Sequence, residues 1–126
     1  MNPAVYDADA LAAADRNERT LWAEHRVRLE GAILPCVPAP VVAQVSRSGR
    51  QAELRRFLRG CTVVDFLEAD AHAAGRLLAR SKTTDVVDAA VVVLAAALGA
   101  EIVTADRDDI ARLLAAARVS LPIVDS

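Results

Sequence analysis

Short apolar segments alternate with helix-forming segments along almost the whole chain. The apolar segments are too short for helices and predict strands at residues 4–6, 33–37, 62–64, 102–104 and 121–124. Between them, capping residues and mixed polar and apolar positions predict helices at 11–15, 21–30, 41–47, 51–59, 68–80 and 85–98, with a last helix from residue 106. Strands separated by helices pair in parallel through right-handed crossovers. The pattern therefore predicts an α/β fold, a sandwich with helices on both faces of a parallel sheet.

The length of 126 residues predicts a single domain over residues 1–126. The longest apolar run, Ala89 to Ala100, is shorter than the roughly 20 residues of a membrane-spanning helix. Acidic residues from Asp7 onward do not fit a secretory signal. The two cysteines, Cys36 and Cys61, stand singly in apolar segments and are expected to be reduced. We therefore expect a cytoplasmic protein without a membrane segment.

The charge of the chain limits how it could hold nucleic acid. The net charge of −2 argues against binding through a broad basic surface, which needs Lys and Arg to neutralise phosphates. An enzyme that touches few phosphates and relies on metal ions is still compatible with this charge. The densest basic segment contains Arg47, Arg50, Arg55, Arg56 and Arg59. It is interpreted either as a solvated helix face or as a guide for phosphates.

Aspartates follow two of the expected strands, one directly and one after a single intervening residue. Asp7 follows the strand at 4–6, and Asp106 follows the strand at 102–104 by one residue. In sheets of this type, ligands bind beyond the carboxyl ends of the strands, where the strand order reverses. If these two strands are neighbours, their acids face each other. Asp88, at the start of the helix before the second strand, adds a third carboxylate, and Asp85 lies three residues earlier.

Carboxylates gathered in this way favour a bound cation. Their mutual repulsion raises their pKa values unless a cation intervenes. Mg²⁺ and Mn²⁺ prefer oxygen ligands and keep waters for a substrate and a nucleophile. His25 and His72 lie in helical segments without the spacing of metal ligands, so no histidine-based site competes with this hypothesis.

Helix capping is the alternative explanation for these acids. Asp7, Asp85 and Asp106 all precede helices, where aspartate caps the backbone and suits the helix dipole. The residues from Asp106 to Asp109 also resemble a capping box. Capping does not account for Asp88, which is expected a full turn inside an apolar helix, or for the gathering of acids at strand ends.

The stretch from Asp88 to Ala95, followed by Gly99 and by Ile102 to Asp106, resembles the signature of the PIN-domain nucleases. Within that family it is most similar to the VapC-type toxins of bacterial toxin–antitoxin pairs. The residues from Val5 to Ala8 are similar to the family's first strand and first acid. The resemblance implies a three-layer sandwich with a five-stranded parallel sheet and a Mg²⁺ or Mn²⁺ ion in an acidic pocket. It also implies endonucleolytic cleavage of RNA, a homodimer and inhibition by a cognate antitoxin.

By this resemblance Asp7, Asp88 and Asp106 are the catalytic, metal-binding acids. The family usually has a Glu in the helix after the second strand, where this chain has Gln44. Glutamine offers an oxygen but no charge and no base. Asp9 stands where the family favours a small or hydroxyl residue, and Asp9, Asp85 or Asp109 could restore the missing charge. Gln44, Asp85 and Asp109 are therefore possible further ligands.

Three other functions are alternatives to the nuclease. A PIN-like binding module impaired by Gln44 would bind its partners without turnover. Asp7-Ala8-Asp9 also fits a phosphatase of the haloacid dehalogenase type, but that family wants Thr or Val at the position of Leu11, a lysine and a longer chain. A receiver-like phosphoacceptor would need a lysine near the last strand, and the only lysine, Lys82, comes too early. Trp22 and Phe57 are interpreted as core or interface residues rather than as base-stacking platforms.

Overall fold

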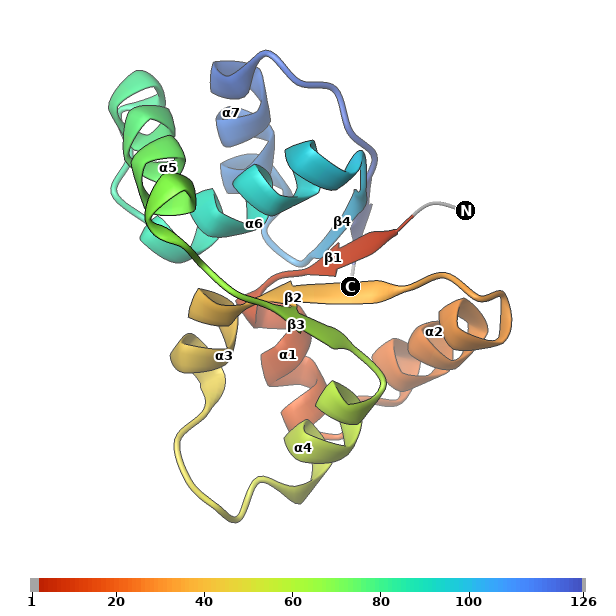
Figure 1. Cartoon of the computed structure of the whole chain (residues 1–126). Coiled ribbons are helices and arrows are strands. Elements are labelled where there is room, and N and C mark those ends of the chain that lie inside the picture. Colours follow the sequence, from red (N-terminus) through yellow and green to blue (C-terminus); the bar gives the residue numbers. More distant parts are fainter. Residues whose placement is uncertain (1–2, 126) are drawn as a thin grey trace.

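The computed structural model describes residues 3–125 and contains one sheet of five parallel strands. The strand order is β3-β2-β1-β4-β5, so the chain starts in the middle of the sheet and builds outward on both sides (Figure 1). The strands are β1 (Ala4–Tyr6), β2 (Pro35–Pro38), β3 (Thr62–Val64), β4 (Glu101–Thr104) and β5 (Ile123–Asp125). The order reverses at β1, which pairs with both β2 and β4.

Seven helices connect and cover these strands. They are α1 (Ala8–Asp15), α2 (Arg19–Glu30), α3 (Ala39–Val45), α4 (Ala52–Arg59), α5 (Glu68–Ser81), α6 (Val86–Leu98) and α7 (Arg107–Ala117). On one face α6 packs against β1, β2 and β4, with α5 and α7 beside it. On the other face α1 packs against β1 and β4, with α2 and α4 beside it (Figure 1). The three-layer α/β sandwich predicted from the sequence is therefore confirmed.

The central strand β1 lies in the densest part of the core. Its three residues are fully buried, because helices cover both faces and strands cover both edges. The Tyr6 hydroxyl makes a hydrogen bond of 2.8 Å with His25 Nδ1 and accepts one of 3.3 Å from Arg28. The ring of Phe57 stacks on His25 with 4.0 Å between ring centres. These contacts fix β1 against α2 and α4, and they explain the burial of a histidine and an arginine.

Several element boundaries differ from those predicted. The strand expected at 33–37 occupies Pro35–Pro38, because the Ile33 N–H still bonds to the Arg28 carbonyl at the end of α2. The helix expected at 41–47 begins at Ala39 and ends at Val45. Proline fits in the first turn of this helix, where no N–H donor is needed. At the end of the helix, side chains donate hydrogen bonds to the backbone carbonyl groups. The strand expected at 121–124 starts only at Ile123, directly after Pro122, which has no N–H to donate.

Both cysteines are free thiols, as expected. Cys36 is buried in β2, and Cys61 is half-buried next to β3. Burial raises the pKa of both thiols, that of Cys61 to about 12, so neither is a ready nucleophile at neutral pH. Among residues 3–125, no helix has the length and apolarity needed to cross a membrane.

Candidate metal centre

The parallel pairing of β1 with β4 brings two of the expected acids to the same edge of the sheet. Tyr6 pairs with Val103, and the N–H of Asp7 donates to the Val103 carbonyl at 3.2 Å. Asp7 thus follows β1 directly and lies beside the end of β4. Asp106 comes two residues after Thr104, the last residue of β4. The expectation that these two strands are neighbours is confirmed.

Asp7 is buried and held by the start of α1. It is 1% exposed, and its Oδ1 accepts the N–H of Ala10 at 2.9 Å, so it caps this helix. Burial raises the pKa of Asp7 to about 6, although hydrogen bonds from the Thr104 hydroxyl and the Ala10 N–H oppose the shift. A carboxylate buried to this degree gains from a cation beside it.

Asp106 lies at the start of α7, but its side chain makes no capping hydrogen bond. Its backbone N–H donates to Thr104 Oγ1 at 2.8 Å. The Thr104 hydroxyl thus accepts the backbone N–H of Asp106, and its proximity to the Asp7 carboxyl lowers the pKa of Asp7. The capping interpretation fits Asp7 but not Asp106, whose carboxylate is left for other partners.

Asp88 lies closer to the helix start than predicted. Helix α6 begins at Val86, so Asp88 is its third residue rather than a full turn inside. Its backbone N–H donates to Asp85 Oδ1 at 3.0 Å, which makes Asp85 the helix cap. An acid in the first turn suits the helix dipole, so the dipole accounts for part of its placement. The Asp88 side chain is half-buried and lines a pocket.

A pocket of about 150 Å³ lies between the ends of β1 and β4 and the starts of α1 and α6. It brings together all three expected catalytic acids and two further aspartates that the sequence singled out. Gln44 of α3 lies in its wall, at the place where a Glu is usual for the family that the motifs resemble. None of the described residues that line the pocket is basic. Its lining residues are Asp7, Ala8, Asp9, Gln44, Asp85, Val87, Asp88 and Asp106.

Carboxylate oxygens of Asp88, Asp106 and Asp109 lie within 4.8 Å of one another. Asp109 is in the first turn of α7 and is more exposed than the other two. Burial, and then the carboxylates of Asp85, Asp7, Asp106 and Asp109, raise the pKa of Asp88 to about 7. Burial and the neighbouring Asp109 also raise the pKa of Asp106. Without a cation, the cluster therefore keeps protons near neutral pH.

The donor set suits a hard divalent cation. It consists of carboxylate oxygens with one nearby amide, and it contains no cysteine or histidine that would select a softer metal. Asp88, Asp106 and Asp109 offer the closest group of oxygens, and Asp7 adds a buried carboxyl to the lining of the same pocket. Four acids from three distant parts of the chain thus fit one ion site.

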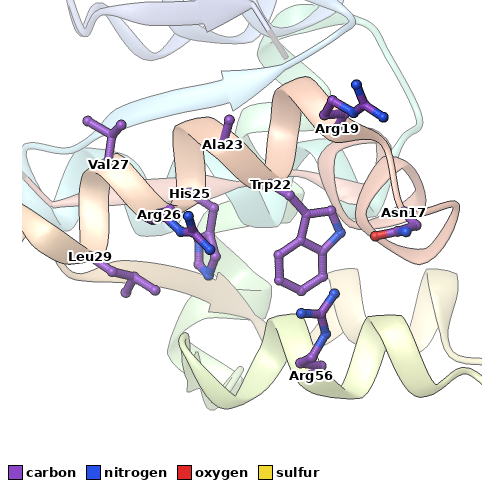
Figure 2. A pocket seen from close by; sticks show the side chains of 9 residues that line it. All are labelled: Asn17, Arg19, Trp22, Ala23, His25, Arg26, Val27, Leu29 and Arg56. Atoms are coloured by element: carbon purple, nitrogen blue, oxygen red, sulfur yellow. The ribbon is translucent and has the colours of Figure 1, made fainter.

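A larger hollow of about 690 Å³ lies elsewhere, along α2 and facing α4 (Figure 2). Its described lining contains no carboxylate and no residue of the acidic pocket. Arg56 of α4 lies over the Trp22 ring, 4.1 Å from its centre, and Arg19 and Arg26 project from α2. The larger hollow therefore lacks the carboxylates of a metal site, and the candidate metal site is the smaller acidic pocket.

Sequence reasoning missed the part that Thr104 plays in the site. Thr104 belongs to the motif of the second acidic turn, but its buried hydroxyl also accepts the backbone N–H of Asp106. A hydroxyl residue at the end of a buried strand, directly before an acidic turn, was the available signal. Asp109 was expected only as a possible ligand, and the structure places its carboxylate near those of Asp88 and Asp106.

An all-parallel sheet with acids gathered where the strand order reverses defines a class of α/β proteins that bind ligands beyond the strand ends. The family model for the PIN domain matches residues 4–115, which is most of the chain. The chain therefore belongs to the PIN-domain family, a family of nucleases. A search of curated proteins gave no significant match.

Solved structures share this fold at low sequence identity. DNA-bound VapBC2 from Rickettsia felis matches with a TM-score of 0.70 and 16% identity, over 98% of both chains. DNA-bound VapBC from Salmonella typhimurium matches with a TM-score of 0.71 and 18% identity, over 99% of this chain and 98% of the other. PAE2754 from Pyrobaculum aerophilum matches with a TM-score of 0.63 and 20% identity, over 98% of this chain and 90% of the other.

The raised pKa values predict how stability depends on pH when metal is absent. Folded Asp7 and Asp88 hold their protons up to about pH 6 and 7, whereas in the unfolded chain they ionise near 3.8. Their contribution is thus most favourable near pH 4 and is lost as pH rises through 6 and 7. After discounting for solvent screening, Asp88→Asn should gain about 1–2 kcal/mol over wild type between pH 5 and pH 7.5.

Urea unfolding in EDTA across this pH range measures the difference between the two proteins. A difference that stays constant with pH would mean that Asp88 has an ordinary pKa and is not crowded by its neighbours. Asp108→Asn is the matched control, because Asp108 is exposed and does not line the pocket.

Proposed function

We propose that this chain is a divalent-metal-dependent endoribonuclease, acting as the toxin of a bacterial toxin–antitoxin pair. The observation that carries the proposal is the gathering of Asp7, Asp88 and Asp106 in one pocket of a PIN-domain fold. Asp7 and Asp106 come from adjacent strand ends, and Asp88 comes from the helix that crosses them. These three acids are the proposed catalytic residues, with Asp85, Asp109 and Gln44 as further possible ligands.

Each residue has a definite part in the proposed site. Asp88, Asp106 and Asp109 would hold Mg²⁺ or Mn²⁺ through their clustered oxygens, and Asp7 would balance its charge from the buried wall. The ion, when bound, polarises a phosphoryl oxygen and lowers the pKa of a water. The N–H of Ala10 keeps the Asp7 carboxylate oriented.

The biological setting follows from the resemblance to VapC-type toxins. Two of the similar structures are DNA-bound VapBC complexes, which supports an antitoxin protein as the partner of this chain. We also infer RNA rather than DNA as the substrate, and a homodimer as the assembly, from the same resemblance. Co-expression with a candidate antitoxin, followed by purification on a tag carried by this chain alone, tests the partner.

A second candidate function is a binding module without turnover. Gln44 lines the pocket where a glutamate is usual, so the site has one negative charge fewer than the family pattern. The nearby Asp9, Asp85 and Asp109 supply three other carboxylates, and this favours the active enzyme. RNA cleavage by the purified chain separates the two functions.

Asparagine at positions 7, 88 and 106 should abolish RNA cleavage while the fold persists. Asparagine keeps the size of aspartate and, at position 7, also caps helices about as well. Each variant should lose the negative charge of one metal ligand and keep its stability. The rate of cleavage should fall by about 100-fold or more. The measurement is cleavage of structured RNA in Mn²⁺, with melting temperatures as the check on folding.

EDTA should abolish the wild-type activity, and Asp108→Asn should leave it unchanged. Cleavage that survives in EDTA would contradict a metal-dependent mechanism. Full activity of Asp88→Asn would remove Asp88 from the site.

Gln44→Glu should strengthen metal binding and raise nuclease activity. The new carboxylate gives a hard cation an anionic oxygen in place of a neutral one. Without metal the same change adds repulsion beside Asp7 and Asp88 and should lower the melting temperature. Mn²⁺ titration followed by thermal melting, together with the cleavage assay, measures both effects.

Ala43→Glu provides the matched control for this change. Ala43 is exposed on the same helix but does not line the pocket. It should leave the metal affinity unchanged. If both glutamate variants raised the metal affinity alike, Gln44 would not be in contact with the ion.

A further inference from the structure

The α3–α4 loop, residues 46–51, continues directly from the helix that carries Gln44. Helix α3 ends at Val45, and α4 begins at Ala52. Residues 46–50 of the loop are all exposed, and two of them are arginines, Arg47 and Arg50. The loop thus places positive charge close to the acidic pocket, in a chain whose net charge is −2.

Gln51 holds the loop in one conformation through four hydrogen bonds. Its Oε1 accepts the N–H of Arg47 at 2.6 Å and that of Ser48 at 3.0 Å. Its Nε2 donates to the Val45 carbonyl at 2.9 Å and to the Asp15 carboxylate at 3.0 Å. These bonds attach the loop to the ends of both α3 and α1. Because the loop is already ordered, a ligand would lose less entropy on binding it.

The guanidinium of Arg47 is fixed at the C-terminal end of α3, the helix that carries Gln44. Its Nη1 donates to the carbonyls of Ala43 at 2.8 Å and Ser46 at 3.0 Å, and Ala43 is the neighbour of Gln44. These two bonds use only part of the five N–H donors of a guanidinium. Arg50 lies further along the loop, and its N–H is bonded to the Ser48 hydroxyl at 3.2 Å. The two charges follow one another away from the pocket.

Three other arginines, one beside the site and two in the basic segment, are engaged elsewhere. Arg107 follows Asp106 directly, but it donates to Asp125 at 3.1 Å and to the Ile123 carbonyl at 2.8 Å. Arg55 bonds to the Gly49 carbonyl of the loop itself. Arg56 pairs with Glu53 and lies over Trp22 (Figure 2). The α3–α4 loop therefore offers Arg47 and Arg50 to solvent.

An acidic pocket repels a polyanion, so an RNA strand entering it needs cations on the way in. We propose that the α3–α4 loop binds the backbone phosphates of an RNA strand where it leaves the pocket past Gln44. Arg47 and Arg50 make the phosphate contacts, and Gln51 is the positioning residue that orders them. The inference rests on the proposed ribonuclease function, and it assigns the basic segment of the sequence to substrate binding.

Arg50→Ala tests the proposal with Arg76→Ala as its matched control. Arg76 is exposed on α5, and its loss changes the net charge equally. The probe is a fluorescein-labelled RNA hairpin, bound in EDTA and cleaved in Mn²⁺. Arg50→Ala should raise the Kd and the KM about tenfold and leave kcat and Mn²⁺ affinity unchanged. The slope of log affinity against log salt should fall by about 0.7.

Gln51→Ala tests whether the ordered conformation of the loop, in addition to its positive charge, contributes to RNA binding. It removes no charge, yet it should raise the KM because the two arginines are no longer held in place. Equal effects of Arg50→Ala and Arg76→Ala on Kd and salt slope would overturn the proposal. Polyglutamate that competes as well as RNA would also overturn it, because the loop would then be a general anion surface.

The same experiment distinguishes failure of the loop from failure of the enzyme. If the protein cleaves no RNA but Arg50→Ala still weakens RNA binding, the nuclease function fails and the loop assignment stands. If the protein cleaves RNA and Arg50→Ala leaves the KM and salt slope unchanged, the loop assignment is wrong and the nuclease stands.

Discussion

The parallel pairing of β1 with β4 is the constraint on which the site depends. Both strands start at the same edge and end at the same edge, so the residues that follow them, Asp7 and Asp106, meet beyond the sheet. The pairing is stable because β1 is fully buried between two helical layers and two neighbouring strands. Helix α6 crosses over the same strands and brings Asp88 to this edge. A buried apolar core thus assembles carboxylates that repel one another.

Local hydrogen bonds offset part of the repulsion between the carboxylates. Asp7 and Asp85 accept backbone N–H groups at the starts of α1 and α6, and these dipoles favour negative charge there. Burial nevertheless raises the pKa of Asp7 to about 6 and, with neighbouring charges, that of Asp88 to about 7. The metal-free protein should consequently be less stable at neutral pH than near pH 4. Capping and cation binding are therefore compatible roles of the same residues.

The sequence predicts what depends on local pattern. Alternating strands and helices gave the sandwich, and acids directly after two strands gave the position of the pocket. The boundary near Pro35 was wrong because a hydrogen bond at the end of α2 outweighed the apolar pattern, and that near Pro122 was wrong because proline has no N–H to donate. The bond of Gln51 to Asp15 joins segments that are distant in the sequence. Spacing in one sequence carries no signal for such a contact.

The central claim is that the crowded acids form one divalent-metal site. Calorimetric titration of Mn²⁺ into the metal-free protein at pH 6.5, in two buffers of different ionisation enthalpy, tests it most directly. The account predicts saturable binding with release of protons, because Asp7 and Asp88 are still partly protonated at that pH. Absence of saturable binding, or binding with no release of protons, would contradict it.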